Sequence, residues 1–197
     1  NTSASQSFSF TLDTAAGSPI VALASDTGTS GSDKITNVGT VTVDGIESGA
    51  TWEYSTNNGT SWTSGSGSSF SVSGDGLKTV LVRQTDIAGN TSASQSFNFT
   101  LDTAASAPGV SLSSDTGSSS SDRITKDGTL SLTGVETGAK VEYSVDGGET
   151  WSTSFSAVEG ANTVLVRQTD VSGNTSAAST YSFTLDKSSP TQPTIFL

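Results

Sequence analysis

The sequence of 197 residues contains no cysteine, no histidine and no methionine. Without cysteine, disulfide bonds cannot stabilise the fold. Without cysteine and histidine, the usual pairs of nucleophile and base are also missing, so we expect a protein that is not an enzyme. Hydrophobic residues make up only 31% of the chain, compared with about 45–50% in average soluble domains. No apolar run is long enough to predict a membrane-spanning helix.

Positive charge is also scarce. The chain has 8 basic and 19 acidic residues, which gives a net charge of −11 and a calculated pI near 4.1. A field of this sign repels nucleic acids and anionic membranes and attracts divalent cations. We therefore expect no nucleic-acid partner and no direct insertion into a membrane.

The strongest feature that is present is an internal repeat. Near-identical phrases begin at Asn1, Asn90 and Asn174, so the copies are 89 and 84 residues apart. A period of that length corresponds to one small domain rather than one turn of a solenoid. The predicted parts are the last strand of a preceding repeat (1–13), repeat 1 (14–102), repeat 2 (103–186) and the start of a following repeat (187–197). Arrays of this kind usually provide reach, spacing or multivalency.

Within repeat 1, short segments with alternating apolar residues are separated by turn residues and show no helical periodicity. The predicted strands are 19–24, 40–44, 51–55, a brief strand around Trp62, 69–73, 79–86 and 90–101. This pattern predicts an all-β fold, with tandem immunoglobulin-like antiparallel β-sandwich domains in a linear array. Trp52 is expected to point into the core, and repeat 2 has Val141 at that position. Repeat 2 is five residues shorter between Trp151 and Val164, which predicts a shortened surface loop or edge strand and an unchanged core.

One short motif follows the third strand. Ser144, Asp146, Gly148, Thr150 and Trp151 match the Asp-box pattern S-x-D-x-G-x-T-W in full, and repeat 1 has a degraded form. The pattern is similar to the repeats of sialidase propellers, where the aspartate bonds to the backbone of a hairpin turn. A single box on a sandwich domain is interpreted as a hairpin staple.

Acidic loops provide the candidate metal ligands. Two aspartates recur at equal spacing in the loop after the first strand of each repeat. Another lies in the phrase T-D-x-x-G-N between the last two strands, and each copy ends on Leu-Asp. With seven alternating strands, the topology predicts that Asp26, Asp33, Asp102, Asp170 and Asn174 gather where repeat 1 joins repeat 2. Such oxygen ligands suit calcium, which takes 6–8 of them. The full candidate set is Asp13, Asp26, Asp33, Asp86, Asn90, Asp102, Asp115, Asp122, Asp170, Asn174 and Asp186.

A simpler interpretation of the same residues is structural. Aspartate and asparagine are common turn formers, so Asp86 and Asn90, with Asp170 and Asn174, could cap tight turns while the other aspartates are solvated loop charges. Both interpretations stay open at this point.

The combined motifs resemble a known family. Leu-Asp-Thr, Ser-Asp-Thr-Gly, Asp-x-Ile-Thr, Tyr-Ser-x-Asp-Gly-Gly-x-Thr-Trp and Arg-Gln-Thr-Asp-x-x-Gly-Asn are similar to the bacterial Ig-like repeats of giant non-fimbrial and RTX-type adhesins. The resemblance implies an extracellular stalk on a bacterial surface, exported by a type I system, with calcium at the domain junctions. The last copy departs from it with Lys187 in place of threonine, which predicts an altered cation site there.

Two functions follow as hypotheses. The first is a calcium-rigidified extender of a surface adhesin, active in cell adhesion or biofilm formation, whose partners are calcium ions and neighbouring repeats of the same, monomeric chain. The second is a binding module that recognises glycan or protein through its loops, with Trp62 and Trp151 stacking on sugar. Burial of these two tryptophans discriminates between the hypotheses.

Overall fold

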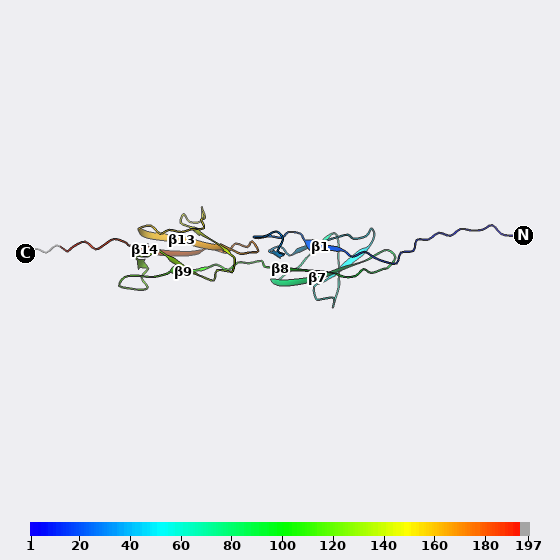
Figure 1. Ribbon diagram of the computed structural model, residues 1–197, viewed down its shortest axis with the longest axis horizontal. Coiled ribbons are helices and arrows are strands. Elements are labelled where there is room, and N and C mark those ends of the chain that lie inside the picture. Colours follow the sequence, from blue (N-terminus) through cyan, green and yellow to red (C-terminus); the bar gives the residue numbers. More distant parts are fainter. Residues whose placement is uncertain (194–197) are drawn as a thin grey trace, which may run out of the picture. The chain divides into compact units, whose positions relative to one another are not determined.

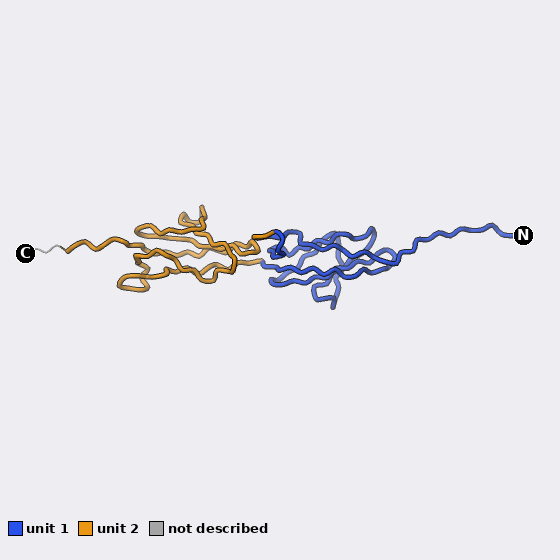
Figure 2. The backbone as a smooth tube through the Cα atoms, in the orientation of Figure 1, with its two compact units in different colours: residues 1–27, 31–102 blue, residues 28–30, 103–197 orange. Residues whose placement is uncertain are grey.

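The computed structural model describes residues 1–193, and these residues form strands, turns and loops (Figure 1). Among them, no helix is long and apolar enough to span a membrane. The chain divides into two compact units (Figure 2). Each unit has its own β-sheets. Unit 1 comprises residues 1–27 and 31–102, and unit 2 comprises residues 28–30 and 103–193 of the described chain. The all-β prediction is confirmed.

Unit 1 is a sandwich of two sheets. One sheet has the strand order β1-β3-β6 and the other has the order β2-β8-β7-β4-β5. All neighbours pair antiparallel except β2 and β8, which are parallel. The bounds are β1 (Ile20–Leu23), β2 (Ile35–Thr36), β3 (Thr40–Asp44), β4 (Thr51–Ser55), β5 (Thr63–Ser64), β6 (Ser69–Ser71), β7 (Gly76–Thr85) and β8 (Gln95–Leu101).

The core of unit 1 follows from alternation along the strands, because every second side chain of a strand faces the same way. Val41 and Val43 on β3 face Val80 and Val82 on β7, and all four are at most 3% exposed. Trp52 is buried, as predicted, and packs 6.1 Å from Phe70 between ring centroids. The two sheets therefore enclose one continuous apolar cluster.

Unit 2 repeats this plan with fewer strands. Its sheets have the orders β11-β9 and β10-β14-β13-β12. The bounds are β9 (Gly109–Leu112), β10 (Ile124–Thr125), β11 (Leu130–Thr133), β12 (Lys140–Ser144), β13 (Gly160–Thr169) and β14 (Ser179–Leu185). Within the described part of unit 2, no strand corresponds to β6.

The shortened segment of repeat 2 changes the core, so the expectation that it would leave the core alone is wrong. In unit 1, β6 brings Phe70 against Tyr54 at 4.0 Å between ring centroids. In unit 2, Phe155 stands in a loop and lies 6.0 Å from Tyr143. Leu130 and Leu132 on β11 are half-buried, whereas Val41 and Val43 are buried. The deletion therefore removes an edge strand and loosens the packing beneath it.

The structure corrects several of the predicted strands; for example, the strand predicted at 79–86 is β7 and begins at Gly76. The sequence predicts no strand between 24 and 40, but this segment contains β2, which adds a parallel edge to β8. The strand predicted around Trp62 begins one residue later, at Thr63, and the one predicted from 90 begins at Gln95. Residues 1–19 form no strand here, so their assignment to a preceding repeat stays a prediction. Residues 194–197, part of the predicted following repeat, lie outside the described residues.

Candidate metal centre

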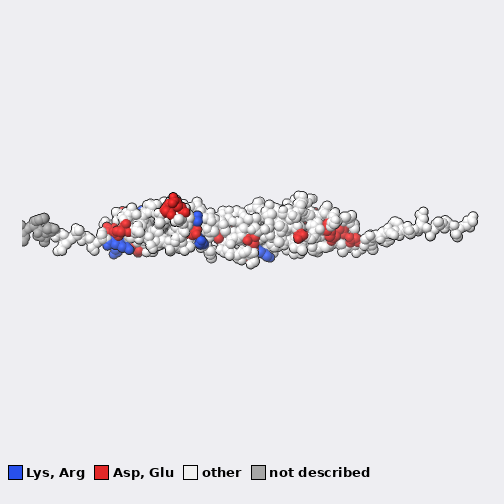
Figure 3. Space-filling view, turned by 90° about the horizontal axis from the view of Figure 1, so that it is seen from above, with Lys and Arg blue, Asp and Glu red and all other residues white. Residues whose placement is uncertain are grey.

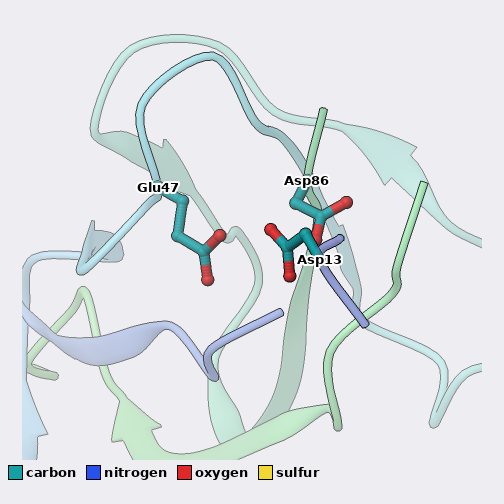
Figure 4. A group of neighbouring side chains, drawn as sticks. All are labelled: Asp13, Glu47 and Asp86. Carbon is teal, nitrogen blue, oxygen red and sulfur yellow. The ribbon is translucent and has the colours of Figure 1, made fainter. Parts of the chain in front are cut away.

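Three carboxylates converge at one end of unit 1. Asp13 comes from the N-terminal segment, Glu47 from the loop between β3 and β4, and Asp86 from the end of β7 (Figure 4). One carboxylate oxygen from each lies within 4.8 Å of the other two. We call these three residues the carboxylate cluster.

Asp86 is held in place by the turn that connects β7 to β8. The main-chain N–H of Asn90 donates to Oδ1 of Asp86 at 2.8 Å, and Nδ2 of Asn90 donates to Oδ2 at 2.7 Å. Gly89 adopts a φ of 92°, which glycine accepts without steric cost and which closes the turn. The hydrogen bond from the Asn90 side chain, the largest contribution, lowers the pKa of Asp86, so this buried carboxylate stays ionised.

Glu47 is positioned by its own main chain and by its carboxylate. Its N–H donates to Oε1 of the buried Gln84 at 2.8 Å. Its Oε1 accepts a hydrogen bond of 2.6 Å from the N–H of Gly17. The loop turns through Gly45 and Gly49, with φ values of 70° and 78°. These contacts orient the Glu47 side chain toward the cluster and use only one of its two oxygens.

Asp13 belongs to the segment that leads into β1. Nδ2 of Asn90 donates to its main-chain oxygen at 3.1 Å, and the N–H of Ala15 donates to its Oδ1 at 3.3 Å. Asn90 thus bridges Asp13 and Asp86 through its amide nitrogen. It was predicted as an oxygen ligand, but in this arrangement it acts as a hydrogen-bond donor that positions two carboxylates.

The donor set is suited to a hard cation. Each carboxylate oxygen carries two lone pairs, so the oxygens that accept hydrogen bonds retain capacity for a metal. The ion pairs described in the chain join Glu53 and Glu142 to basic side chains and do not involve the cluster. Figure 3 shows red acidic side chains gathered where the N-terminal segment meets unit 1. Three like charges this close repel one another unless a cation offsets them.

Repeat 2 carries the same residue types at equivalent positions. Glu136 corresponds to Glu47, Asp170 to Asp86, and Asp102 to Asp13. Within unit 2, the N–H of Asn174 donates to Oδ1 of Asp170 at 2.8 Å, and its Nδ2 donates to Oδ2 at 2.8 Å. The turn after β13 is therefore built in the same way as the turn after β7.

The aspartates after β1 and β9 fold their own loops. Oδ2 of Asp26 accepts from the N–H of Lys34 at 2.9 Å, and Asp33 accepts from the N–H of Ile35 at 3.0 Å. Asp115 and Asp122 make the equivalent bonds in unit 2, at 2.9 and 3.0 Å. Oδ1 of Asp26 and Oδ1 of Asp115 are buried and have no hydrogen-bond partner among the described residues. In each of these two loops, this one buried carboxylate oxygen, Oδ1 of Asp26 or of Asp115, is therefore the atom that fits a cation.

The two groups of aspartates lie at opposite ends of a sandwich. Asp86 follows β7 beyond the Val82–Gln95 pair, whereas β2, which follows Asp33, pairs with the far end of β8. Asp102 also lies at that far end, where its N–H donates to the oxygen of Thr36 at 3.0 Å. The predicted joint between repeats draws on both units and stays a prediction. At the last Leu-Asp end, hydrogen bonds from Ser188 lower the pKa of Asp186.

The Asp-box hairpins are formed in both units. Oγ of Ser144 donates to Oδ1 of Asp146 at 2.7 Å, and the N–H of Thr150 donates to the same atom at 3.0 Å. In unit 1, Asn57 replaces the aspartate and still accepts from the N–H of Ser61 at 2.9 Å. The staple interpretation is supported by these contacts.

Both hairpin tryptophans are half-buried and covered on one face. The guanidinium carbon of Arg83 lies 3.9 Å from the ring centroid of Trp62, and Arg167 lies 3.9 Å from that of Trp151. Each arginine also pairs with a glutamate on the neighbouring strand, Arg83 with Glu53 and Arg167 with Glu142. A sugar could stack on that face only by displacing the arginine, which weakens the glycan-binding hypothesis.

Glu47 is the cluster residue that the sequence analysis missed. Both repeats share the pattern Gly-x-Glu-x-Gly, at Gly45 to Gly49 and at Gly134 to Gly138. An alignment of the two copies marks this glutamate as an acidic position in common. It lies in a loop between strands, however, and strand alternation alone gives no indication that the loop folds back on Asp86.

Comparison with known proteins places this architecture in a family. A solved structure of the fibronectin(III)-like modules of Clostridium thermocellum CbhA aligns with 84% of this chain and 94% of that chain, at 12% sequence identity and a TM-score of 0.42. No curated protein sequence matches the chain. The family model described as "Bacterial Ig-like domain" matches residues 15–103 and again residues 104–187. The chain therefore belongs to the bacterial Ig-like domain family and contains two adjacent copies of the domain.

Proposed function

We propose that these repeats are calcium-rigidified extender domains of a large bacterial surface adhesin. The observation that carries the proposal is the convergence of Asp13, Glu47 and Asp86 where the N-terminal segment meets the sandwich. A cation held there would link the segment that precedes a domain to the loops of that domain. The linker would then lose freedom, and the role of the chain would be length and stiffness rather than catalysis.

Calcium suits this set better than magnesium. The ligands come from two loops and a linker segment, and calcium accepts 6–8 oxygens in flexible geometry, whereas magnesium requires near-ideal octahedral geometry. Three carboxylates supply up to six oxygens, and water can complete the shell. The high charge of the set favours binding at the calcium concentrations outside cells.

The membership of the family supports an extracellular, surface-exposed location, and adhesion or biofilm formation is the function in which such a stalk would serve. Two adjacent copies of one domain support a spacer, because repetition multiplies length. The net charge of −11 would keep the chains apart from one another and from anionic surfaces.

Thermal unfolding of the 197-residue chain in excess EDTA and in millimolar calcium tests the calcium site. Binding to the folded state stabilises it by mass action, so saturation at about 100 times the Kd raises the free energy of unfolding by about 2.7 kcal/mol. That corresponds to a rise in Tm of about 10 °C or more for a domain of this size. The double variant Asp86→Asn and Asp170→Asn keeps an acceptor for the main-chain N–H of Asn90 and Asn174, but its amide nitrogen cannot accept from their Nδ2 atoms. Its Tm in calcium is therefore compared with its own Tm in EDTA, and the variant is expected to abolish most of the rise.

Small-angle scattering with and without calcium tests the mechanical part of the proposal. Calcium is expected to narrow the distribution of interdomain distances. Equal distributions in both conditions would refute the rigidification, and an unchanged Tm would refute the calcium site.

A further inference from the structure

A buried glutamine lies directly behind each acidic turn. Gln84 and Gln168 are fully buried, and each precedes its turn aspartate by two residues. A buried amide is costly unless its polar atoms are all satisfied. Their hydrogen bonds therefore indicate what these side chains are for.

Gln84 satisfies its amide by binding two other segments of unit 1. Its Oε1 accepts from the N–H of Glu47 at 2.8 Å. Its Nε2 donates to the main-chain oxygens of Gly17 at 2.7 Å and Gly45 at 3.1 Å. One side chain on β7 thus holds both the loop that carries Glu47 and the linker segment that carries Asp13.

Gly17 is bound on both sides of its peptide unit. Its oxygen accepts from Gln84, and its N–H donates to the Glu47 carboxylate at 2.6 Å. The residue itself is exposed and belongs to no strand. These two bonds therefore act on the linker and not on the core of the sandwich.

Unit 2 contains the same set of bonds. Oε1 of Gln168 accepts from the N–H of Glu136 at 2.8 Å, and its Nε2 donates to the oxygens of Ser106 at 2.6 Å and Gly134 at 3.0 Å. The N–H of Ser106 donates to Glu136 at 3.0 Å. The linker residue differs between the copies, but the contacts use only its main chain, so they tolerate the change.

We infer that Gln84 and Gln168 are positioning residues that clamp the linker onto the domain that follows it before any cation binds. Glu47 takes part in both events, because one carboxylate oxygen fixes Gly17 and the other remains for the cluster. Linker docking and cation binding then form one coupled equilibrium. A linker that is already docked loses less freedom when the cation binds, which strengthens binding. The coupling rests on the calcium site proposed above, whereas the clamp itself does not.

The test uses the 197-residue chain, amide hydrogen exchange by NMR in EDTA, and a calcium titration. The amides of Gly89 and Gly173 report on the two acidic turns separately. In the wild type without cation, the Gly17 and Ser106 amides are expected to exchange at least about tenfold more slowly than an unstructured chain. Gln84→Leu removes the clamp of repeat 1 only. Gly17→Pro, at an exposed position away from the core, replaces the N–H that donates to Glu47 with a ring carbon, so it removes that bond and displaces the Glu47 carboxylate.

Both variants are expected to weaken calcium binding by the carboxylate cluster of repeat 1 by about tenfold, as reported by the Gly89 amide. Each removes hydrogen bonds that order the linker. Gln84→Leu is also expected to remove the exchange protection of the Gly17 amide. The exchange rate of the Ser106 amide and the calcium titration reported by the Gly173 amide stay unchanged and serve as the internal control. If Gln84→Leu unfolds repeat 1, an unchanged calcium affinity of Gly17→Pro still refutes the coupling.

Two results overturn the inference. One is free exchange of Gly17 in the wild type without cation, and the other is an unchanged calcium affinity in the variants. If the wild type shows protected Gly17 and Ser106 amides but no calcium titration at either turn, the calcium proposal and the coupling are wrong and the clamp stands.

Discussion

Replacing Glu47 with glutamine is expected to change stability in opposite directions with and without calcium. The substitution removes one charge from the carboxylate cluster and keeps an oxygen that can accept from Gly17, whose N–H lies 2.6 Å from Oε1 of Glu47. Without cation, the change relieves repulsion between oxygens that lie within 4.8 Å of one another. With calcium, it removes an attraction.

The size of the calcium effect follows from Coulomb's law. A cation among these oxygens lies about 2.4 Å from each ligand, and at the dielectric constant of water a single carboxylate attracts a divalent ion at that distance by about 3.5 kcal/mol. Salt screening and the amide oxygen that remains as a ligand reduce the loss to roughly half, or about 20-fold in Kd. At saturating calcium, that loss lowers the Tm of repeat 1 by about 10 °C.

Differential scanning calorimetry in EDTA and in millimolar calcium measures both effects. In EDTA, Glu47→Gln is expected to raise the Tm by about 2–4 °C, because less like charge is held together. The matched control is Glu149→Gln, which removes an equal charge from an exposed position in the Asp-box hairpin. A shift of the same sign in both solutions, or the same pair of shifts from the control, would refute this reasoning.

Three further predictions concern the two sandwiches. Phe70→Ala is expected to destabilise repeat 1 by about 3–5 kcal/mol, as for other buried phenylalanines. Phe155→Ala is expected to destabilise repeat 2 by less, because the ring of Phe155 packs in a loop. Urea unfolding of each variant measures the two free energies. Asp146→Ala is expected to lower the urea midpoint of repeat 2 through lost turn hydrogen bonds, and Asn57→Ala is expected to lower that of repeat 1 in the same assay. Hydrogen bonds, above all from the Thr150 hydroxyl, lower the pKa of Asp146. The stability that ionised Asp146 contributes to repeat 2 is therefore complete above the ordinary aspartate pKa and is lost as the pH falls through the pKa of the folded state. Asp146→Asn is expected to flatten the acid side of the plot of unfolding free energy against pH.

The sheets could be predicted because their cause is local. Alternation places Val41 and Val43 on one face, and the turn residues between segments set the strand ends. β2 was missed since its two residues lie within a long polar loop and gain their strand only by pairing with Thr100 and Leu101 of a distant segment. A pairing of that kind depends on tertiary structure and leaves no periodic signal in a stretch of two residues.

The site was predictable in part for a similar reason. Antiparallel topology fixes the ends of strands, so the placement of Asp26 and Asp86 at opposite ends of the sandwich follows from counting strands. Glu47 depends instead on how a loop folds back, and that path is set by Gln84, a buried amide whose partners lie 37 and 67 residues away in sequence. No local pattern encodes contacts of that range.

The two interpretations of the acidic turns are therefore not exclusive. Asp86 does form the tight turn, since both of its oxygens accept hydrogen bonds from Asn90. Those bonds fix the direction of the carboxylate and lower its pKa, which are the two conditions that a metal ligand requires. A turn aspartate that merely capped the chain would have no need of Asp13 and Glu47 beside it, where their charges oppose folding. The repulsion that the fold tolerates at this point is the physical argument for a cation, and the sign reversal expected for Glu47→Gln is its direct consequence.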